Sequence, residues 1–260
     1  MRVRPPAVAG SFYPDDPVLL AGTVDGYLAD APRRAGAPPR ALVAPHAGYV
    51  YSGPVAGSAF GTLRGAAERF RRVLLLGPSH YVAIAGLALP TAEAFETPLG
   101  RVALDPSARS ALAGLPQVAV ADAPHAREHS LEVELPFLQR LLGAFLLVPL
   151  AVGDATDEEV AQVLDRLADD ATLVVVSTDL SHYLPYEAAR RADRRTSDAI
   201  ETLRPEAIGE LDACGRVPLR GLLRWARARG LACERLDLRN SGDTAGPPER
   251  VVGYGAYAFA

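Results

Sequence analysis

Short runs of apolar residues alternate with longer segments in which apolar positions recur at helical spacing. Four of the runs are strongly apolar and lack the polar alternation of a half-exposed strand, so they predict strands that are buried on both faces. These four runs are 41–45, 72–78, 145–152 and 172–178, and two weaker strands are expected at 86–90 and 251–259.

The segments between these runs predict amphipathic helices. The expected helices are 16–31, 54–70, 131–143, 157–170, 186–203 and 218–230. Alternation of strands and helices predicts an α/β fold, with a central mixed, largely parallel sheet flanked by helices. The sequence contains no internal repeat and no low-complexity linker, so we expect a single domain over residues 1–260.

Composition and charge narrow the possible chemistry. The formal net charge of −4 gives no broad basic surface, which argues against nucleic-acid binding. All 27 basic residues are arginine, which excludes Schiff-base lysines and the phosphate-binding lysine of a P-loop. Two cysteines are too few for a disulfide scaffold. The sequence shows neither a signal peptide nor a run of the roughly 18 apolar residues that span a bilayer, so we expect a cytoplasmic protein without membrane contact.

Three of the five histidines follow strongly apolar runs. His46, His80 and His182 each come just after such a run, and Asp179 lies three residues before His182. In an open α/β sheet, ligands bind outside the carboxyl ends of the strands, so these imidazoles could meet at one edge. A single histidine in such a loop is more often a hydrogen-bonded structural residue. Three in the same kind of place favour a shared site.

The other two histidines, His125 and His129, are four residues apart. On a helix this spacing places both on one face, as in some metal sites. Pro124 precedes the pair and Ser130 resembles a helix N-cap, so we interpret the segment as a loop that enters a helix. His129 is then the expected pocket residue, and His125 is expected to face solvent.

The two cysteines have different surroundings. Cys233 lies in a predicted strand, where a small buried thiol is common. Cys214 lies at the expected end of a helical segment closed by Gly215, where the helix dipole raises the pKa of a thiol. A chemical role for Cys214 therefore needs a cation that holds it as thiolate, and a metal ion supplies one.

Eight motifs occur in order along nearly the whole chain: RPPAVAGSFYP, APHAGYVYSGPVA, LLLGPSHY, FETPLG, REHSLEVELPFLQ, VSTDLSHY, CGRVPLRGLL and VVGYGAYAF. Each motif is weak alone, whereas the ordered set is specific. With this set the sequence resembles the MEMO family, whose bacterial and archaeal members include AmmeMemoRadiSam system protein B. That family is similar in fold to the class III (LigB-type) non-heme iron extradiol dioxygenases, which implies the same α/β architecture as the apolar pattern.

The resemblance implies a set of site residues. The metal-binding residues of the family map onto His46, His80 and Cys214. Its further pocket residues map onto Asp179 and His182, with His182 as the acid/base residue and Asp179 as its neighbour.

The identity of the metal stays open at this point. In the related dioxygenases two histidines and a glutamate hold Fe(II), and here a cysteine takes the place of the glutamate. Because a thiolate is softer than a carboxylate, the site also accepts copper or zinc. Fe(II) is the first expectation. Tyr49, Tyr51 and His129 are expected on the substrate side of the ion.

These features support more than one function. The leading hypothesis is a metal-dependent oxidoreductase, dioxygenase-like, that acts on a small molecule. The alternatives are a binding module for a peptide or partner protein without turnover, and a zinc-dependent hydrolase. For prokaryotic members the resemblance also implies AMMECR-type and radical-SAM proteins as partners.

Overall fold

A mixed sheet, nine-stranded within the described residues 2–33 and 36–260, forms the centre of this computed structural model. Residue 1 and residues 34–35 of the expected 1–260 domain lie outside the described residues. The strand order is β10, β12, β2, β9, β3, β8, β4, β7, with β11 paired to β12. The bounds are β2 Ala41–Ala44, β3 Arg72–Pro78, β4 Leu87–Leu89, β7 Val118–Val120, β8 Leu146–Val152, β9 Thr172–Ser177, β10 His182–Leu184, β11 Cys233–Asn240 and β12 Val251–Phe259.

The middle of the sheet is parallel and its flanks are mixed. Strands β2, β9, β3 and β8 pair in parallel, as the alternation of strands and helices predicts. Strand β12 runs antiparallel to β2, β11 and β10, and β4 runs antiparallel to β8. The expected α/β fold with a mixed sheet flanked by helices is therefore confirmed, and its parallel part consists mainly of these four middle strands.

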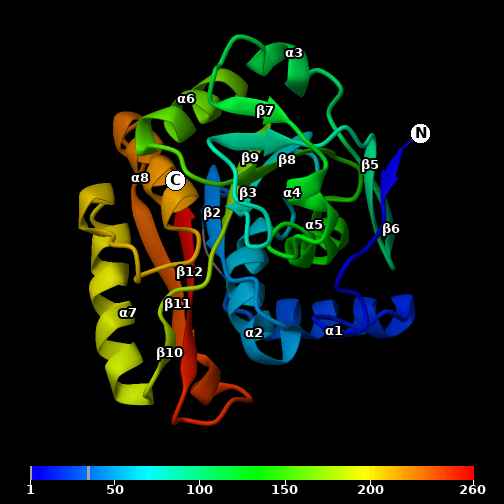
Figure 1. The fold of residues 1–260 in the computed structure, drawn as a ribbon. Coiled ribbons are helices and arrows are strands. Elements are labelled where there is room, and N and C mark those ends of the chain that lie inside the picture. The colour runs from blue at the N-terminus through cyan, green and yellow to red at the C-terminus, as the bar shows by residue number, and fades with distance from the viewer. Residues whose placement is uncertain (1, 34–35) are drawn as a thin grey trace.

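Helices cover both faces of the sheet (Figure 1). Helices α1 (Pro17–Asp30), α2 (Tyr49–Phe60) and α5 (Leu135–Leu142) pack on one face. The opposite face carries α3 (Ala108–Leu112), α6 (Asp157–Leu167), α7 (Tyr186–Glu201) and α8 (Arg216–Ala228). Within the described part of the chain, none of the helices has both the length and the apolar character needed to cross a membrane.

The continuous apolar runs are explained by these two layers. In β3, Val73 and Leu75 belong to the core beneath α1, α2 and α5, whereas Leu74 and Leu76 belong to the core beneath α6 and α8. Successive side chains of a strand point to opposite faces, so a strand covered on both sides needs apolar residues at every position. Each fully buried side chain of this kind contributes about 1.5–3 kcal/mol.

Smaller elements complete the fold. Strands β1 (Val3–Arg4), β5 (Ala94–Thr97) and β6 (Gly100–Ala103) form a separate three-stranded sheet. A short helix, α4 (Ala123–Ala126), precedes the loop that carries His129. The remaining elements are 3-10 turns: η1 Gly61–Leu63, η2 Glu132–Glu134, η3 Pro205–Ala207 and η4 Ser241–Asp243.

Two expected helices begin or end elsewhere. The helix expected at 54–70 begins at Tyr49 and ends, through the turn η1, at Leu63. Gly65 follows with φ +76°, a left-handed conformation that a helix cannot continue through. The helix expected at 131–143 is divided into η2 and α5. The expected N-cap Ser130 does not cap it; its side chain is buried and donates to the Pro78 carbonyl.

A buried ion pair fastens the N-terminal segment to the loop before α5. The Arg4 guanidinium pairs with the Glu132 carboxylate, and the two side chains are 6% and 0% exposed. Glu132 also accepts the main-chain N–H groups of Ala7 and Val8, at 2.7 and 3.1 Å, and the hydroxyl of Tyr13. Arg4 donates in addition to the His125 carbonyl at 3.0 Å. The loop with His129 is therefore tied down on its buried side.

We predict that Arg4→Ala lowers the free energy of unfolding by about 3–5 kcal/mol, because it leaves the Glu132 carboxylate buried without its counter-ion. The exposed pair Arg40–Asp170 provides the control, and Arg40→Ala should cost less than about 1 kcal/mol. Urea denaturation followed by circular dichroism measures both. Equal effects of the two substitutions would contradict the anchoring role.

Candidate metal centre

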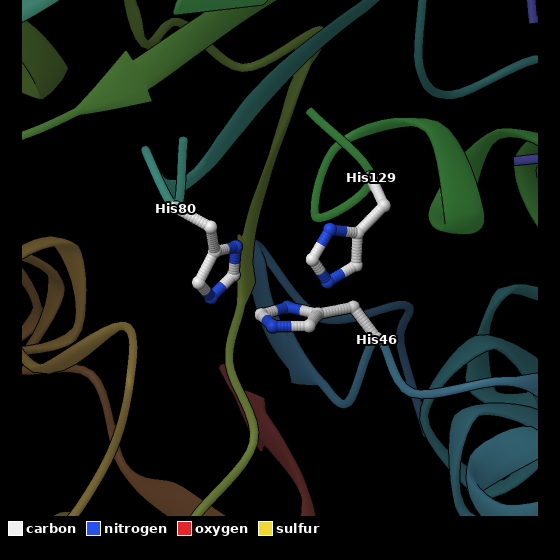
Figure 2. A group of neighbouring side chains, drawn as sticks. All are labelled: His46, His80 and His129. Atoms are coloured by element: carbon white, nitrogen blue, oxygen red, sulfur yellow. The ribbon is translucent and has the colours of Figure 1, made fainter. Parts of the chain in front are cut away.

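Three imidazoles from separate segments meet at one edge of the sheet. His46 follows β2, His80 follows β3, and His129 lies in the loop between α4 and η2. Each offers a ligand atom within 4.8 Å of the others. Figure 2 shows the three rings turned toward one another. The ring centroids of His80 and His129 are 4.6 Å apart, and His46 lies 5.2 and 5.4 Å from them.

Hydrogen bonds fix the His46 ring and its tautomer. The Ser177 hydroxyl donates its only proton to the Ser130 carbonyl at 2.6 Å. The Ser177 oxygen lies 2.6 Å from His46 Nδ1 and must therefore accept a proton from it. His46 Nε2 is then the unprotonated nitrogen of the ring. The His46 main-chain N–H donates to Asp179 Oδ1 at 2.9 Å.

The Glu128 carboxylate orients His80 in the same way. His80 Nδ1 donates to Glu128 Oε1 at 2.9 Å, and the His80 main-chain N–H donates to Oε2 at 2.6 Å. The main-chain N–H groups of His129 and Ser130 also donate to Oε1. Burial alone would raise the pKa of Glu128, but these bonds and the nearby His80 lower it to about 2. A carboxylate behind a histidine is the usual support of a metal-binding imidazole.

His129 lies between aromatic side chains. Its ring centroid is 4.7 Å from that of Phe12 and 5.9 Å from that of Tyr81. Its Nδ1 lies 3.4 Å from Glu128 Oε1. Burial lowers the pKa of His129 to about 4, against the opposing charge of Glu128.

The chemistry of the donors fits a metal ion. Burial first, and then the neighbouring imidazoles, lower the pKa of His46 well below its ordinary value. His46 and His129 are thus neutral near pH 7, the form that binds metals. Imidazole donors suit zinc, copper and iron.

Cys214 lies beside this group. Its Sγ is 3.3 Å from His46 Nε2 and accepts the Asp179 main-chain N–H at 3.3 Å. Cys214 is not among the three residues that form the cluster. The expectation that it ends a helix is wrong: Gly215 is the N-cap of α8, so Cys214 precedes a helix. Burial, and then the charge of Asp179, raise the pKa of the thiol to about 12. The thiolate form of Cys214 therefore still requires a nearby cation to stabilise it.

The acid/base pair expected from the sequence lines the same cleft, which has a volume of about 730 Å³. Burial raises the pKa of Asp179 to about 7, although the His46 N–H and the charge of His80 oppose the shift. Burial lowers the pKa of His182, which the Leu180 carbonyl opposes. Both residues follow β9.

The residues expected on the substrate side have different positions. Tyr51 and His129 line the cleft. Tyr49 does not: it is 3% exposed, packs in the core, and donates its hydroxyl to the Val133 carbonyl at 2.8 Å. The reason is that α2 begins at Tyr49 and turns this side chain inward. His125, expected in solvent, is 1% exposed and its Nε2 lies 2.9 Å from the Ala88 carbonyl.

Two buried carboxyl groups near the site were missed by sequence reasoning. Glu128 directly precedes His129, and this adjacency of carboxylate and imidazole was a usable signal. Glu134 gave no such signal. It is fully buried, and among the described residues neither carboxyl oxygen has a hydrogen-bond partner. Burial raises the pKa of Glu134 well above its ordinary value, and the charge of Asp179 adds to the shift.

Comparison with known proteins identifies the family. The Memo-like protein family matches this chain over residues 4–258. A MEMO1 family protein from Aquifex aeolicus is 36% identical over 267 residues, which cover 98% of each chain. A MEMO1 family protein from Methanopyrus kandleri is 36% identical over 279 residues, again 98% of each chain. The chain belongs to the Memo family, and the resemblance found in its motifs is confirmed.

A solved structure shares the fold at much lower identity. The crystal structure of an uncharacterized protein from Escherichia coli K12 superposes with a TM-score of 0.55 and 14% sequence identity. The match covers 83% of this chain and 98% of that chain. At such low identity the likeness concerns the fold alone.

We predict that Glu128→Gln weakens metal binding by about 10–100-fold, because it removes the charge that holds His80. Isothermal titration of the folded variant with Zn(II) measures the affinity. Glu158→Gln on α6, whose carboxylate pairs with Arg224 at the surface, is the matched control and should leave the affinity unchanged. Unchanged affinity in Glu128→Gln would show that Glu128 does not support a metal ligand.

Glu134→Gln should stabilise the protein increasingly as pH rises. Folded Glu134 keeps its proton at a pH where the unfolded chain, with a pKa near 4.5, has released it. Wild-type stability therefore falls with rising pH, by up to about 1.4 kcal/mol per pH unit, and the glutamine variant lacks this loss. Asp179 and Tyr49, the titratable groups that face Glu134, are present in both proteins. Urea denaturation from about pH 5 to about pH 8 gives the difference, and a difference that does not grow with pH would refute a neutral Glu134.

Proposed function

We propose that this protein binds a divalent transition metal, Fe(II) in first place, and acts as a metal-dependent oxidoreductase on a small molecule. The observation that supports this proposal is the convergence of His46, His80 and His129 on the floor of an open cleft. Copper and zinc remain alternatives, since the same donors accept both. The cytoplasmic location and the AMMECR-type and radical-SAM partners remain predictions from the sequence.

The ligand set follows from the positions of the side chains. His46 and His80 present Nε2 toward the cleft because Ser177 and Glu128 occupy their Nδ1 atoms. His129 completes the group, and Cys214 is placed beside His46 as a further donor. A bound Fe(II) would supply open coordination positions and redox chemistry at this point.

His182 is the proposed acid/base residue. It lines the cleft together with the cluster, and it is close enough to His46 for the two imidazoles to influence each other. A neutral imidazole here can accept a proton from a bound substrate and return it. Asp179 is proposed to hold the His46 main chain and to balance charge.

The three-imidazole group also favours a second candidate, a zinc-dependent hydrolase. Three histidines with an open fourth position are one arrangement of catalytic zinc, which generates a nucleophilic water near neutral pH. Metal content after anaerobic purification, together with turnover, separates the two candidates. A metal-free protein that still binds a partner protein would instead favour the binding-module alternative.

The ligand assignment is tested by metal content and affinity in single variants. We predict that His46→Ala, His80→Ala and His129→Ala each lose stoichiometric metal, and that Cys214→Ser binds metal more weakly. Elemental analysis of anaerobically purified protein measures this. Tyr186→Phe, outside the cleft, is the control and should keep its metal. If His129→Ala kept its metal and Cys214→Ser lost it, the set would be His46, His80 and Cys214, as the resemblance implies.

His182→Ala should retain the metal and lose turnover by about 10²–10⁴-fold, the usual contribution of a general acid/base. The comparison requires metal content and rate on the same preparation. Loss of metal in this variant would make His182 a ligand and would overturn its assigned role.

A further inference from the structure

One arginine stands at the wall of the cleft without an acidic partner. Arg250 lines the cleft and is exposed, and its guanidinium carbon lies 4.6 Å from the centroid of the Tyr183 ring. Among the residues that the structure describes, no carboxylate forms an ion pair with it. Several other exposed arginines are paired, as Arg140 is with Asp25. Arg250 is therefore available to an anion from outside the chain.

Tyr183, which contacts this arginine, has an unusual backbone conformation. Tyr183 has φ 59°, a left-handed conformation that is costly for a residue with a Cβ. It lies where the pairing of β10 with β12 shifts register, between His182 and Leu184. Such a bulge re-aims a side chain, and here it directs the Tyr183 ring along the cleft toward Arg250.

The contact with Tyr183 leaves the N–H donors of Arg250 free to bind a ligand. The guanidinium carbon of Arg250 lies over the Tyr183 ring, and the N–H donors of a guanidinium lie in its own plane. These donors match the two oxygens of a carboxylate in a bidentate contact. Arg250 and Tyr183 together thus present guanidinium N–H donors to the cleft.

The remainder of the cleft favours a flat, anionic ligand. Its other walls carry the aromatic side chains of Phe12, Tyr51 and Tyr81. Within the described residues, Asp179 is the single acidic residue of the lining, and it is buried at the floor.

We propose that Arg250, positioned by Tyr183, recognises the carboxylate of a planar aromatic acid that enters the cleft. This inference rests on the proposed function, since it takes the cleft as the substrate site. It narrows the small molecule to a class: a flat ring that bears an anionic group, held at the mouth by Arg250 with its ring among the aromatic walls.

The test compares two probes of the same shape, para-fluorobenzoate and para-fluorobenzamide, by fluorine NMR titration of the metal-free and Zn(II)-loaded protein. We expect the wild type to bind the acid about tenfold more tightly than the amide, the value of one charged hydrogen-bonded contact. In Arg250→Gln the two affinities should become equal. Arg250→Lys, which keeps the charge and loses the planar edge, should fall between.

Arg190→Gln is the matched control. Arg190 also lies over a tyrosine ring, 5.7 Å from the centroid of Tyr186, but it pairs with Glu187 and lies outside the cleft. It should leave the preference for the acid unchanged. The proposal is overturned if neither probe binds, if wild type does not prefer the acid, or if the preference survives in Arg250→Gln.

The experiments distinguish failure of the Arg250 proposal from failure of the proposed metal centre. A preference for the acid in metal-free protein that binds no metal would sustain the role of Arg250 and reject the metal centre. Stoichiometric metal without a preference for the acid would support the metal centre and reject the role of Arg250.

Discussion

The parallel pairing of β2, β9 and β3 is the constraint on which the site depends. Ala44 pairs with Ser177, and β3 runs beside β9 in the same direction, so the three strands end at one edge. His46, Asp179 and His80 follow these ends within a few residues. Side chains as far apart in the sequence as His46 and Asp179 are thereby brought together.

A second layer of polar contacts converts this proximity into a defined arrangement. Ser177 and Glu128 determine which nitrogen of His46 and of His80 faces the cleft. Arg4 and Glu132 tie the loop with His129 to the N-terminal segment. These groups are buried and hydrogen-bonded, so each of them restricts the geometry strongly. Glu134 is the exception, because its buried carboxyl group has no hydrogen-bond partner among the described residues. It keeps its proton, which lowers the free-energy cost of burying it.

The fold and the site carry different information about function. The Memo family matches residues 4–258, and the Escherichia coli structure shares the fold at 14% identity. One architecture can host many reactions, so the chemistry must be argued from the side chains. Here these are three imidazoles with a thiol beside them and, at the rim, an arginine that pairs with no carboxylate of the described residues. This combination favours a metal with an anionic ligand.

The sequence by itself determined the α/β class, the main strands and helices, and the family. Apolar runs such as 72–78 have one structural explanation, a strand covered on both faces, and the same runs placed His46 and His80 at the sheet edge. Tertiary structure decided which histidines meet. His129 joins the cluster, His125 enters the core, and Tyr49 turns inward, although all three belong to locally similar polar or aromatic stretches. Their positions depend on contacts with distant segments such as Arg4 and β3. The local periodicity of the sequence does not predict such contacts.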